Sequence, residues 1–487
     1  MSISDYLVRG DAPLAAALHL MDRNGLGLAF AVDADGRLLG TVDVARVQAA
    51  LEKGGPADRV ATAVTKADGL PVGVDVAQFA SRMNGSAYVI PLIDAERRVV
   101  EFISPARPKR IPVAEPCLAG NELKYVTECI TTNWISSQGT FVRRFETDFA
   151  ARLGVPHALA VSNGTVALHL ALTAFGIGPG DEVIVPDLTF AATINAVIHA
   201  GATPVIVDVD PNTWNLDPAA AAAAITPRTR AIMPVHLYGQ PADMDAIMDL
   251  AKRHDLIVIE DAAEAAGSFH RDRPCGAIGH AGTFSFFSNK LITTGEGGMV
   301  VFRDAKPAER ARMLRDHGMN PARRYWHDDV GFNYRLTNLQ AAIGCAQLEQ
   351  FDRFLARKLE IARAYRRRLS QIDGLLLPAE IDGWANSYWV FSLILDGRRF
   401  GIDRDQLMAR LDKAGIETRP VFHPLHAMPP YRGYAGSRDL PNATRLSGAG
   451  LSLPSGVTLT DGEIDYVCGV IERCLATRLL VQRIGSA

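Results

Sequence analysis

Short apolar runs alternate with segments of helical periodicity in the middle of the chain, and this alternation restricts the possible folds most. The apolar runs are residues 158–162, 182–186, 204–207, 231–235 and 257–260, and the helical segments between them are residues 165–175, 191–200, 219–225 and 244–254. Strands that are joined by helical crossovers form a largely parallel sheet buried on both faces. Such sheets bind ligands at the carboxyl ends of their strands, so polar side chains there are candidate site residues.

Length and charge limit the class of protein. The 487 residues exceed one compact domain and predict two or three. A net charge of −3 gives no reason to expect nucleic acid or an anionic membrane as a partner. No apolar run approaches the roughly 18 residues of a membrane span, and the first residues have no signal-peptide pattern. We therefore expect a cytoplasmic protein.

The six cysteines are scattered and form no CxxC pair. Cys468 and Cys474 also lack the usual spacing of zinc ligands. We expect reduced, buried thiols and no metal site.

A weak internal repeat marks the N-terminal part of the chain. Residues 31–42 (AVDADGRLLGTV) and 92–103 (LIDAERRVVEFI) align, with Asp33 matching Asp94 and Arg37 matching Arg98. Each repeat reads as a strand, an acidic turn and a second strand. Helical patterns precede the two hairpins, at residues 14–21 and 76–83. The repeat predicts two helix–strand–strand halves that bury their faces on each other.

This pattern resembles a pair of CBS motifs, small modules that often bind adenine nucleotides between their repeats. The family has a hydroxyl residue and then an aspartate where this chain has Asp43 and Arg46, and Glu101 replaces a glycine of the second repeat. We interpret residues 1–105 as a degenerate CBS-pair-like domain with a structural or assembly role, with regulation by a nucleotide as the alternative. The Pro-rich, basic residues 106–112 are the expected linker.

A lysine directly follows a β-prone apolar run in residues 281–299 (AGTFSFFSNKLITTGEGGM). Lys290 stands between that run and several glycines. Burial lowers the pKa of a lysine, and a neutral amine can attack a carbonyl carbon. On its position alone, Lys290 is either a Schiff-base lysine or a surface lysine on a turn.

Three other strand ends carry residues that could complete a site. Residues 162–165 (SNGT) lie between a strand and a helix, where free N–H groups bind an anion or where an ordinary N-cap forms. Asp261 follows a fully apolar strand and either faces a cationic ring nitrogen or caps the next turn. Phe190 follows another strand, as a stacking ring or as part of the core.

These parts together match one cofactor, pyridoxal 5'-phosphate. The turn at residues 162–165 would anchor the phosphate, and Asp261 would keep the pyridine nitrogen protonated, which lets the ring take up electrons. Phe190 would cover one face of the ring. Lys290 would carry the cofactor and move protons.

Long segments of the chain also resemble a known family. The matching segments are SNGTVALHLAL, GPGDEVIVPDLTF, IEDAAEAAG, FSFFSNKLITTGEGGM and GFNYRLTNLQAAIGCAQLE. From about residue 112 to its end, the chain is similar to the DegT/StrS family of nucleotide-sugar aminotransferases. Within that family, NWISSQGTFVRRFE, PVHLYGQPADMD and DHGMNPARRYWHDDVGFNYRLTN are most similar to the GDP-perosamine synthases. The resemblance implies the α/β architecture of fold type I, which is aspartate aminotransferase-like. Residues 113–355 would form a large domain with a mostly parallel sheet, and residues 356–487 a smaller α+β domain.

The resemblance also implies roles for individual residues. The expected cofactor-binding set is Lys290 as cofactor-bearing catalytic residue, Asp261 at the pyridine nitrogen, Glu264 near the ring hydroxyl, Gly164, Thr165 and Ser285 at the phosphate, Phe190 on the ring, and Asn333 reaching the phosphate of a second subunit. The family assembles its active sites between subunits, so we expect a homodimer or a higher homo-oligomer. Many relatives have glutamine at the position of Glu264.

Further residues are candidates for contacts with the sugar and the nucleotide. They are Trp134, His317, Tyr325, Trp326, His327 and Arg419. Arginine can bind a diphosphate through two parallel hydrogen bonds, although Arg419 in a structural ion pair is an equal alternative.

Three functions remain open from the sequence. The first is transfer of an amino group from L-glutamate to a nucleotide-linked 4-keto-6-deoxy sugar, GDP-4-keto-6-deoxymannose or a UDP- or dTDP-linked sugar. The second is dehydration of the keto sugar at C3, which relatives with histidine in place of Lys290 perform. The third is a degenerate relative that only senses a nucleotide. The lysine favours transamination.

Overall fold

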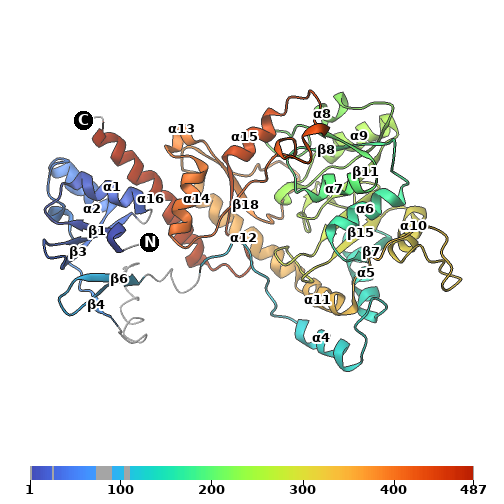
Figure 1. Ribbon diagram of the computed structural model, residues 1–487, viewed down its shortest axis with the longest axis horizontal. Helices are drawn as coiled ribbons and strands as arrows, with labels where there is room; N and C mark the ends of the chain where they lie inside the picture. The colour runs from blue at the N-terminus through green and yellow to red at the C-terminus, as the bar shows by residue number, and fades with distance from the viewer. Residues whose placement is uncertain (1–2, 25–26, 73–89, 104–109, 486–487) are drawn as a thin grey trace.

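The computed structural model describes residues 3–24, 27–72, 90–103 and 110–485. Figure 1 shows the N-terminal residues at one end of an elongated molecule and the largest sheet at the other, with a smaller sheet between them. None of the described helices is long and apolar enough to cross a membrane.

The central element is a seven-stranded sheet with the strand order β7-β15-β14-β11-β10-β8-β9. Its strands are β7 (His157–Val161), β8 (Glu182–Pro186), β9 (Thr203–Val207), β10 (Thr229–Ile232), β11 (Ile257–Asp261), β14 (Ala281–Ser285) and β15 (Gly298–Phe302). Only β15 runs antiparallel to its neighbours in this sheet. The predicted mostly parallel sheet is therefore confirmed, and β15 is an addition to it.

Eight helices of this part of the chain connect or cover the strands. They are α4 (Glu122–Thr131), α5 (Thr140–Leu153), α6 (Gly164–Ala174), α7 (Ala192–His199), α8 (Pro218–Ala223), α9 (Met244–His254), α10 (Ala305–Arg315) and α11 (Asn338–Leu348). The predicted strand at residues 231–235 ends earlier, at Ile232, because Pro234 has no N–H to donate to a neighbouring strand.

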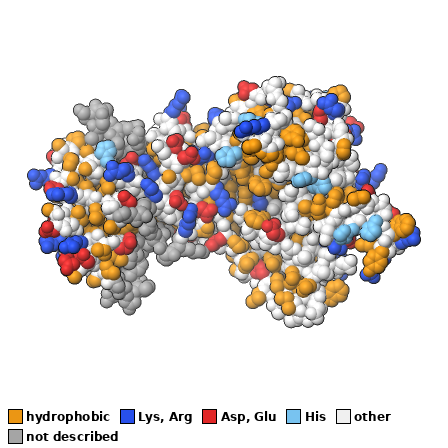
Figure 2. Space-filling model, viewed as in Figure 1, with side chains coloured by type: hydrophobic (Ala, Val, Ile, Leu, Met, Phe, Trp, Pro, Cys, Tyr) orange, Lys and Arg blue, Asp and Glu red, His pale blue; other side chains and the backbone are white. Residues whose placement is uncertain are grey.

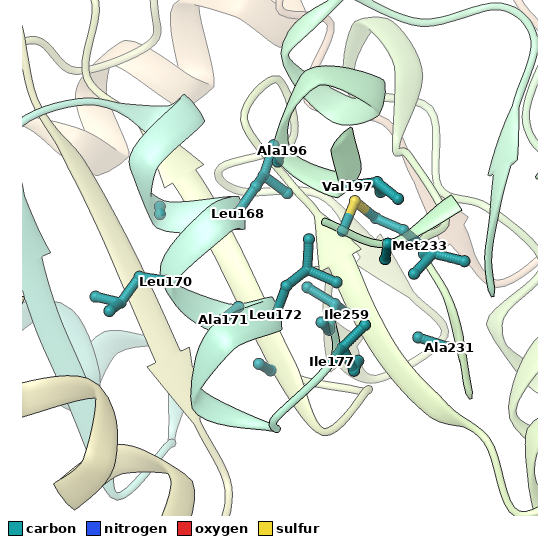
Figure 3. Close-up of a cluster of buried hydrophobic side chains, with 14 of the residues drawn as sticks. Leu168, Leu170, Ala171, Leu172, Ile177, Ala196, Val197, Ala231, Met233 and Ile259 are labelled. Atoms are coloured by element: carbon teal, nitrogen blue, oxygen red, sulfur yellow. The ribbon is translucent and has the colours of Figure 1, made fainter. Parts of the chain in front are cut away.

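Helix α6 lies in the middle of the main hydrophobic core. Figure 3 shows Leu168 and Leu172 of this helix beside Val197 of α7 and Ile259 of β11. All four side chains are almost fully buried. Burying a leucine side chain contributes about 2 kcal/mol. The packing therefore fixes the start of α6 relative to the strand ends.

The C-terminal part forms a second, smaller sheet with helices packed around it. Its four-stranded sheet has the order β16-β18-β20-β19, with β16 (Leu375–Leu376), β18 (Phe391–Leu395), β19 (Arg419–Pro420) and β20 (Gly450–Leu453). The helices are α12 (Phe351–Leu369), α13 (Gly397–Phe400), α14 (Arg404–Lys413), α15 (Pro441–Ala449) and α16 (Asp461–Gly485). The helix predicted at 359–369 begins eight residues earlier, since Phe351 and Phe354 are also buried.

The predicted internal repeat is present in the N-terminal part. Its elements are β1 (Leu7–Arg9), α1 (Leu14–Asn24), β2 (Leu28–Val32), β3 (Leu38–Asp43) and α2 (Val44–Lys53), followed by β4 (Leu70–Pro71), β5 (Ile90–Ile93) and β6 (Val99–Ile103). Each half has a parallel pair and then an antiparallel hairpin, in the order β1-β2-β3 and β4-β5-β6. The parallel strands β1 and β4 and the helix α2 were not predicted, and the helix expected at residues 76–83 lies outside the described residues.

The two hairpin turns have the same geometry and contact each other. Asp33 accepts a hydrogen bond from the backbone N–H of Arg37, and Asp94 accepts one from Arg98, both at 2.8 Å. A short β-bridge joins Arg37 to Arg98. The two halves are thus related by an approximate two-fold arrangement at their turns.

Candidate active site

Parallel strands bring several polar residues to one edge of the large sheet. Gly164 follows β7, Asp187 follows β8, Asp261 ends β11 and Ser285 ends β14. These strands run in the same direction, so the residues after them meet at one edge. This is the edge at which the sequence predicted a site.

Lys290 enters this edge from a tight turn after β14. The backbone N–H of Lys290 donates to the carbonyl of Phe287 at 3.0 Å, and Thr294 pairs with Phe286 at 2.9 Å. Gly295 closes the loop with a φ of 81°, a conformation that favours glycine. The lysine side chain is 12% exposed, and its Nζ lies 3.7 Å from Glu264 Oε1.

The protonation of Lys290 is set by opposing effects. Burial lowers the pKa of its amine, whereas the carboxylates of Glu264 and Asp261 raise it, and Arg419 lowers it further. The net direction is downward, which favours the neutral, nucleophilic amine. The alternative of a surface lysine on a turn is wrong, because the side chain points into a largely buried site.

Asp261 is a buried carboxylate with fixed orientation. It accepts a hydrogen bond from Thr193 Oγ1 at 2.8 Å and one from the N–H of Ala263 at 3.2 Å. Thr189 in turn hydrogen-bonds to Thr193 at 2.8 Å. Burial raises the pKa of Asp261 despite these bonds. A cation facing this carboxylate would favour its charged form, as a protonated ring nitrogen would.

Glu264 lies between Lys290 and a main-chain donor. Its Oε2 accepts from the N–H of Tyr238 at 2.8 Å, while Oε1 faces the lysine. Burial raises the pKa of Glu264 to about 7. The carboxyl group can therefore gain or lose a proton near neutral pH.

The predicted phosphate-binding residues lie together at the start of α6. Asn163 caps this helix by accepting from the N–H of Val166 at 3.0 Å. A Cβ atom on Gly164 would lie 3.0 Å from the Cβ of Ser285, which is closer than an ordinary contact. Only glycine keeps this gap open beside the Ser285 hydroxyl and Thr165. Free N–H groups at a helix start favour an anion in such a gap.

Phe190 is not part of the core. Its side chain is 59% exposed in the loop between β8 and α7, and its ring centroid lies 5.8 Å from that of Phe422. An exposed aromatic ring at this edge fits a flat ligand better than the core alternative does.

The sugar-contact candidates fall into two groups. Arg419 acts electrostatically on Lys290 and so lies near it, and its guanidinium also contacts Glu417 at 3.4 Å. Tyr325 and Trp326 instead are exposed on the segment after α10, where Figure 1 shows the chain projecting from the body. The ring of His327 donates to the carbonyl of His317 at 2.9 Å within this segment.

Asn333 and Trp134 are also accessible in the single chain. The Asn333 side chain accepts from Arg335 Nε at 3.2 Å, and the Trp134 indole is exposed. In the part of the chain that the structure describes, neither residue lines the cavities beside Lys290. One chain therefore brings together Lys290, Asp261, Glu264 and the start of α6. Trp134, Asn333 and the segment that carries Tyr325 and Trp326 do not line these cavities.

Four residues of the site were missed by sequence reasoning. Thr193 orients Asp261, Tyr238 holds Glu264, and the face of Trp389 lies 3.7 Å from Lys290 Nζ. His426 donates from Nδ1 to the buried Asp187 at 2.5 Å. Only Thr193 carried a signal, since it lies in the first turn of α7, the helix that follows the strand end at which Phe190 was predicted.

The cysteines were expected to be buried, and Cys117 departs from this because it is partly exposed. All six cysteines are free, and five of them are buried. The described residues contain no cluster of side chains suited to a metal ion.

A buried lysine beside carboxylates, at the carboxyl edge of a mixed seven-stranded sheet, is a candidate active site, because pKa values shifted by burial and by neighbouring charges cluster at such sites. Residues 116–472 match the DegT/DnrJ/EryC1/StrS aminotransferase family, and the chain belongs to this family.

Individual relatives agree with this membership. GDP-perosamine synthase of Caulobacter vibrioides is 52% identical over 367 residues, which are 75% of this chain and 98% of the relative. GDP-perosamine synthase of Escherichia coli O157:H7 is 46% identical over 74% of this chain and 97% of its own length. The crystal structure of the aminotransferase TlmJ from Streptoalloteichus hindustanus has a TM-score of 0.71 and 35% identity, over 75% of this chain and 99% of that chain.

Proposed function

We propose that this protein is a pyridoxal phosphate-dependent aminotransferase that converts a GDP-linked 4-keto-6-deoxy sugar into the 4-amino sugar. L-glutamate is the amino donor and leaves as 2-oxoglutarate. The observation that carries the proposal is the largely buried Lys290 beside Glu264 at the strand edge that also holds Asp261. The substrate follows from the identity of 52% and 46% with two GDP-perosamine synthases.

The residues present fit pyridoxal phosphate. Asp261 would face the pyridine nitrogen, and Gly164, Thr165 and Ser285 would hold the phosphate in the narrow gap at the start of α6. Phe190 would stack on the ring. When bound, the cofactor supplies a ring that takes up electrons from the carbon that loses its proton.

The chain's own residues account for the proton movements. Lys290, with a lowered pKa, takes a proton from the α-carbon of glutamate in the first half-reaction and returns one to C4 of the sugar in the second. Glu264, with a pKa of about 7, holds or releases a proton beside the lysine. The aromatic residues around the lysine exclude water from the reacting atoms.

We further propose that the active site is shared between two subunits. Large hydrophobic side chains are exposed around α4, at the strand edge and on the projecting segment: Leu118, Leu123, Ile130, Trp134, Ile135, Phe190, Tyr325, Trp326 and Val330. Figure 2 shows orange side chains on the surface of this half of the molecule. Exposed apolar patches mark interaction surfaces. Asn333, His317 and His327 would then reach the site of the partner, with Trp134, Tyr325, Trp326 and Arg419 as further sugar or nucleotide contacts.

A complementation experiment tests this sharing. Lys290→Ala and Asn333→Ala are co-expressed in one cell, each with its own purification tag. A hybrid dimer contains one site with an intact lysine and an intact asparagine. The proposal predicts that the doubly purified hybrid regains activity, and hybrids as inactive as the two parents would contradict it.

The remaining assignments concern the organisation of the chain. We propose that residues 1–105 are a degenerate CBS-pair-like domain, joined by the linker 106–112 to a large domain of residues 113–355 and a small domain of residues 356–487. The repeated strand order supports this. We assign the first domain a structural or assembly role, because the Asp43 carboxylate caps α2 through the N–H of Arg46 at 2.8 Å. We also place the protein in the cytoplasm.

Titration of the full chain with AMP and with ATP tests the role of this domain. We expect flat calorimetric traces. Heat of binding that disappears on Asp43→Ala would contradict the structural role.

Product analysis tests the main proposal. The purified protein is incubated with L-glutamate and GDP-, UDP- or dTDP-linked 4-keto-6-deoxy sugars, and the products are identified by mass spectrometry. We expect the GDP-linked 4-amino sugar and an equal amount of 2-oxoglutarate. Loss of water from the sugar without glutamate consumption would instead identify a 3-dehydratase. Turnover of only UDP- or dTDP-linked sugars would show that the assignment of a GDP-linked substrate is wrong.

A further inference from the structure

Trp389 contacts the proposed cofactor lysine directly. The Nζ atom of Lys290 lies 3.7 Å from the centroid of the Trp389 ring. The edge of the same ring is fixed, because Nε1 donates to the carbonyl of Asn289 at 2.8 Å. One aromatic side chain thus binds the main chain next to Lys290 and also presents its face to the amine. The indole is almost completely buried, so it has little freedom to move.

A second lysine holds the main chain of Trp389 in place. Lys358 of α12 is only 3% exposed, and its Nζ donates to the carbonyls of Trp389 at 2.8 Å and Ser455 at 2.5 Å. A neutral amine has two N–H donors, and these two carbonyls use both. Burial lowers the pKa of Lys358 to about 7, so the neutral amine is the main form above that pH.

A second aromatic ring also supports the indole. The ring of Tyr238 stacks on Trp389 with a centroid distance of 6.1 Å and an interplanar angle of 20°. The N–H of Tyr238 donates to Glu264, which faces Lys290. The groups on both sides of the lysine amine are therefore linked to each other through Tyr238.

We propose that Trp389 is a positioning residue for Lys290, and that Lys358 sets the position of Trp389 through its main-chain carbonyl. This rests on the proposed role of Lys290 in transamination. An aromatic face attracts an ammonium without fixing a single hydrogen-bond direction. Trp389 can therefore stabilise the protonated lysine while its amine moves between reacting atoms. Lys358, which carries no carboxylate partner among the described residues, connects this support to the small domain.

The charged state of Lys290 gives a readout that needs no sugar substrate. The groups that act on it are Glu264 and Asp261, which favour the ammonium, and Arg419, which opposes it. Trp389 also favours the ammonium through its ring face. Removing that face is expected to lower the pKa of Lys290 by about 0.5 to 1 unit, from the usual strength of a cation–π contact.

The test measures modification of Lys290 in the full chain after removal of any cofactor. Trinitrobenzenesulfonate reacts with neutral amines, so the rate of modification of the Lys290 peptide against pH reports its pKa. We expect the midpoint to fall in Trp389→Leu and to fall less in Trp389→Phe, which keeps an aromatic face. The matched control is Trp384→Leu, since Trp384 packs on His270 and should leave the midpoint unchanged.

Lys358→Met tests the second half of the proposal. We expect a smaller downward shift of the same midpoint, together with a change in the fluorescence of Trp389. If Trp389→Leu and Trp389→Phe both match the wild type to within about 0.2 pH unit, the positioning role of Trp389 is wrong. An unchanged midpoint and an unchanged fluorescence in Lys358→Met would show that Lys358 does not set the position of Trp389. Neither outcome depends on which sugar the enzyme uses.

Discussion

Two lysines line one small cavity beside the large sheet, and their surroundings differ. Lys290, which follows β14, faces the carboxylates of Glu264 and Asp261. Lys358 of α12 donates only to main-chain carbonyls among the described residues. Burial lowers the pKa of both amines. Burial is therefore common to both amines, and we propose that the adjoining acids and the gap at the start of α6 are what make Lys290 the reactive one.

Replacing each lysine in turn should give the largest difference between the two positions. Lys290→Ala should lower kcat by roughly 10³-fold or more, because it removes both the nucleophile and the proton carrier. Lys358→Met should lower it only a few-fold. Steady-state turnover with L-glutamate and the GDP-linked keto sugar measures both. The exposed Lys306→Ala serves as the control, and equal losses in the two cavity variants would contradict the distinction.

The carboxylate at the end of β11 should have the next largest effect. Asp261→Asn keeps the size of the side chain but removes the negative charge that would hold a ring nitrogen protonated. We expect kcat to fall by about 10²-fold and the cofactor to bind more weakly, as measured by its release on dialysis. Asp249→Asn on the exposed face of α9 is the control. Wild-type turnover in Asp261→Asn would show that the charge is not used.

Glu264→Gln tests how the charge of Glu264 acts on Lys290. Glu264 has a raised pKa of about 7, so its charge beside Lys290 is lost as the pH falls through this value. The variant should lack the limb near pH 7 in the profile of kcat/KM, and kcat should fall about 10-fold. The pKa of Lys290 should also decrease, because Glu264 raises it. A profile that keeps the limb would assign it to another group.

Lys358→Met should change stability with pH. The folded-state pKa of Lys358, about 7, lies below the ordinary value of 10.5. Between these values the unfolded chain binds a proton that the folded chain does not, so the free energy of unfolding of the wild type falls as the pH is lowered from 10.5 to 7. The variant lacks this loss.

Urea unfolding measures this effect. Relative to the wild type, the free energy of unfolding of Lys358→Met should rise by on the order of 3 kcal/mol between about pH 10 and about pH 7. The loss of the two hydrogen bonds shifts the whole curve but not its slope. Parallel curves for the two proteins would mean that Lys358 is charged when folded.

The sequence predicted the parallel sheet and its strand edge because apolar runs and helical crossovers are local patterns. Asp261, which ends one of these strands, could be placed for the same reason, whereas Ser285 was placed only through the resemblance to the family. Trp389 and Lys358 could not, since their contacts depend on how residues 356–487 pack on the large sheet. Tyr238 could not either, because its bond to Glu264 joins two loops that lie 26 residues apart in the sequence. The antiparallel β15 was also missed, because its glycine start reads as a continuation of the loop after Lys290.

Reduction of the cofactor-loaded protein with sodium borohydride identifies the lysine that carries pyridoxal phosphate. The reductant fixes pyridoxal phosphate covalently to the lysine that carries it, and peptide mass spectrometry then locates the added mass. We predict one pyridoxyl phosphate group on the peptide that contains Lys290 and none on the peptide that contains Lys358. Label on the Lys358 peptide, or no label on the Lys290 peptide of a protein that retains the cofactor, would contradict the account.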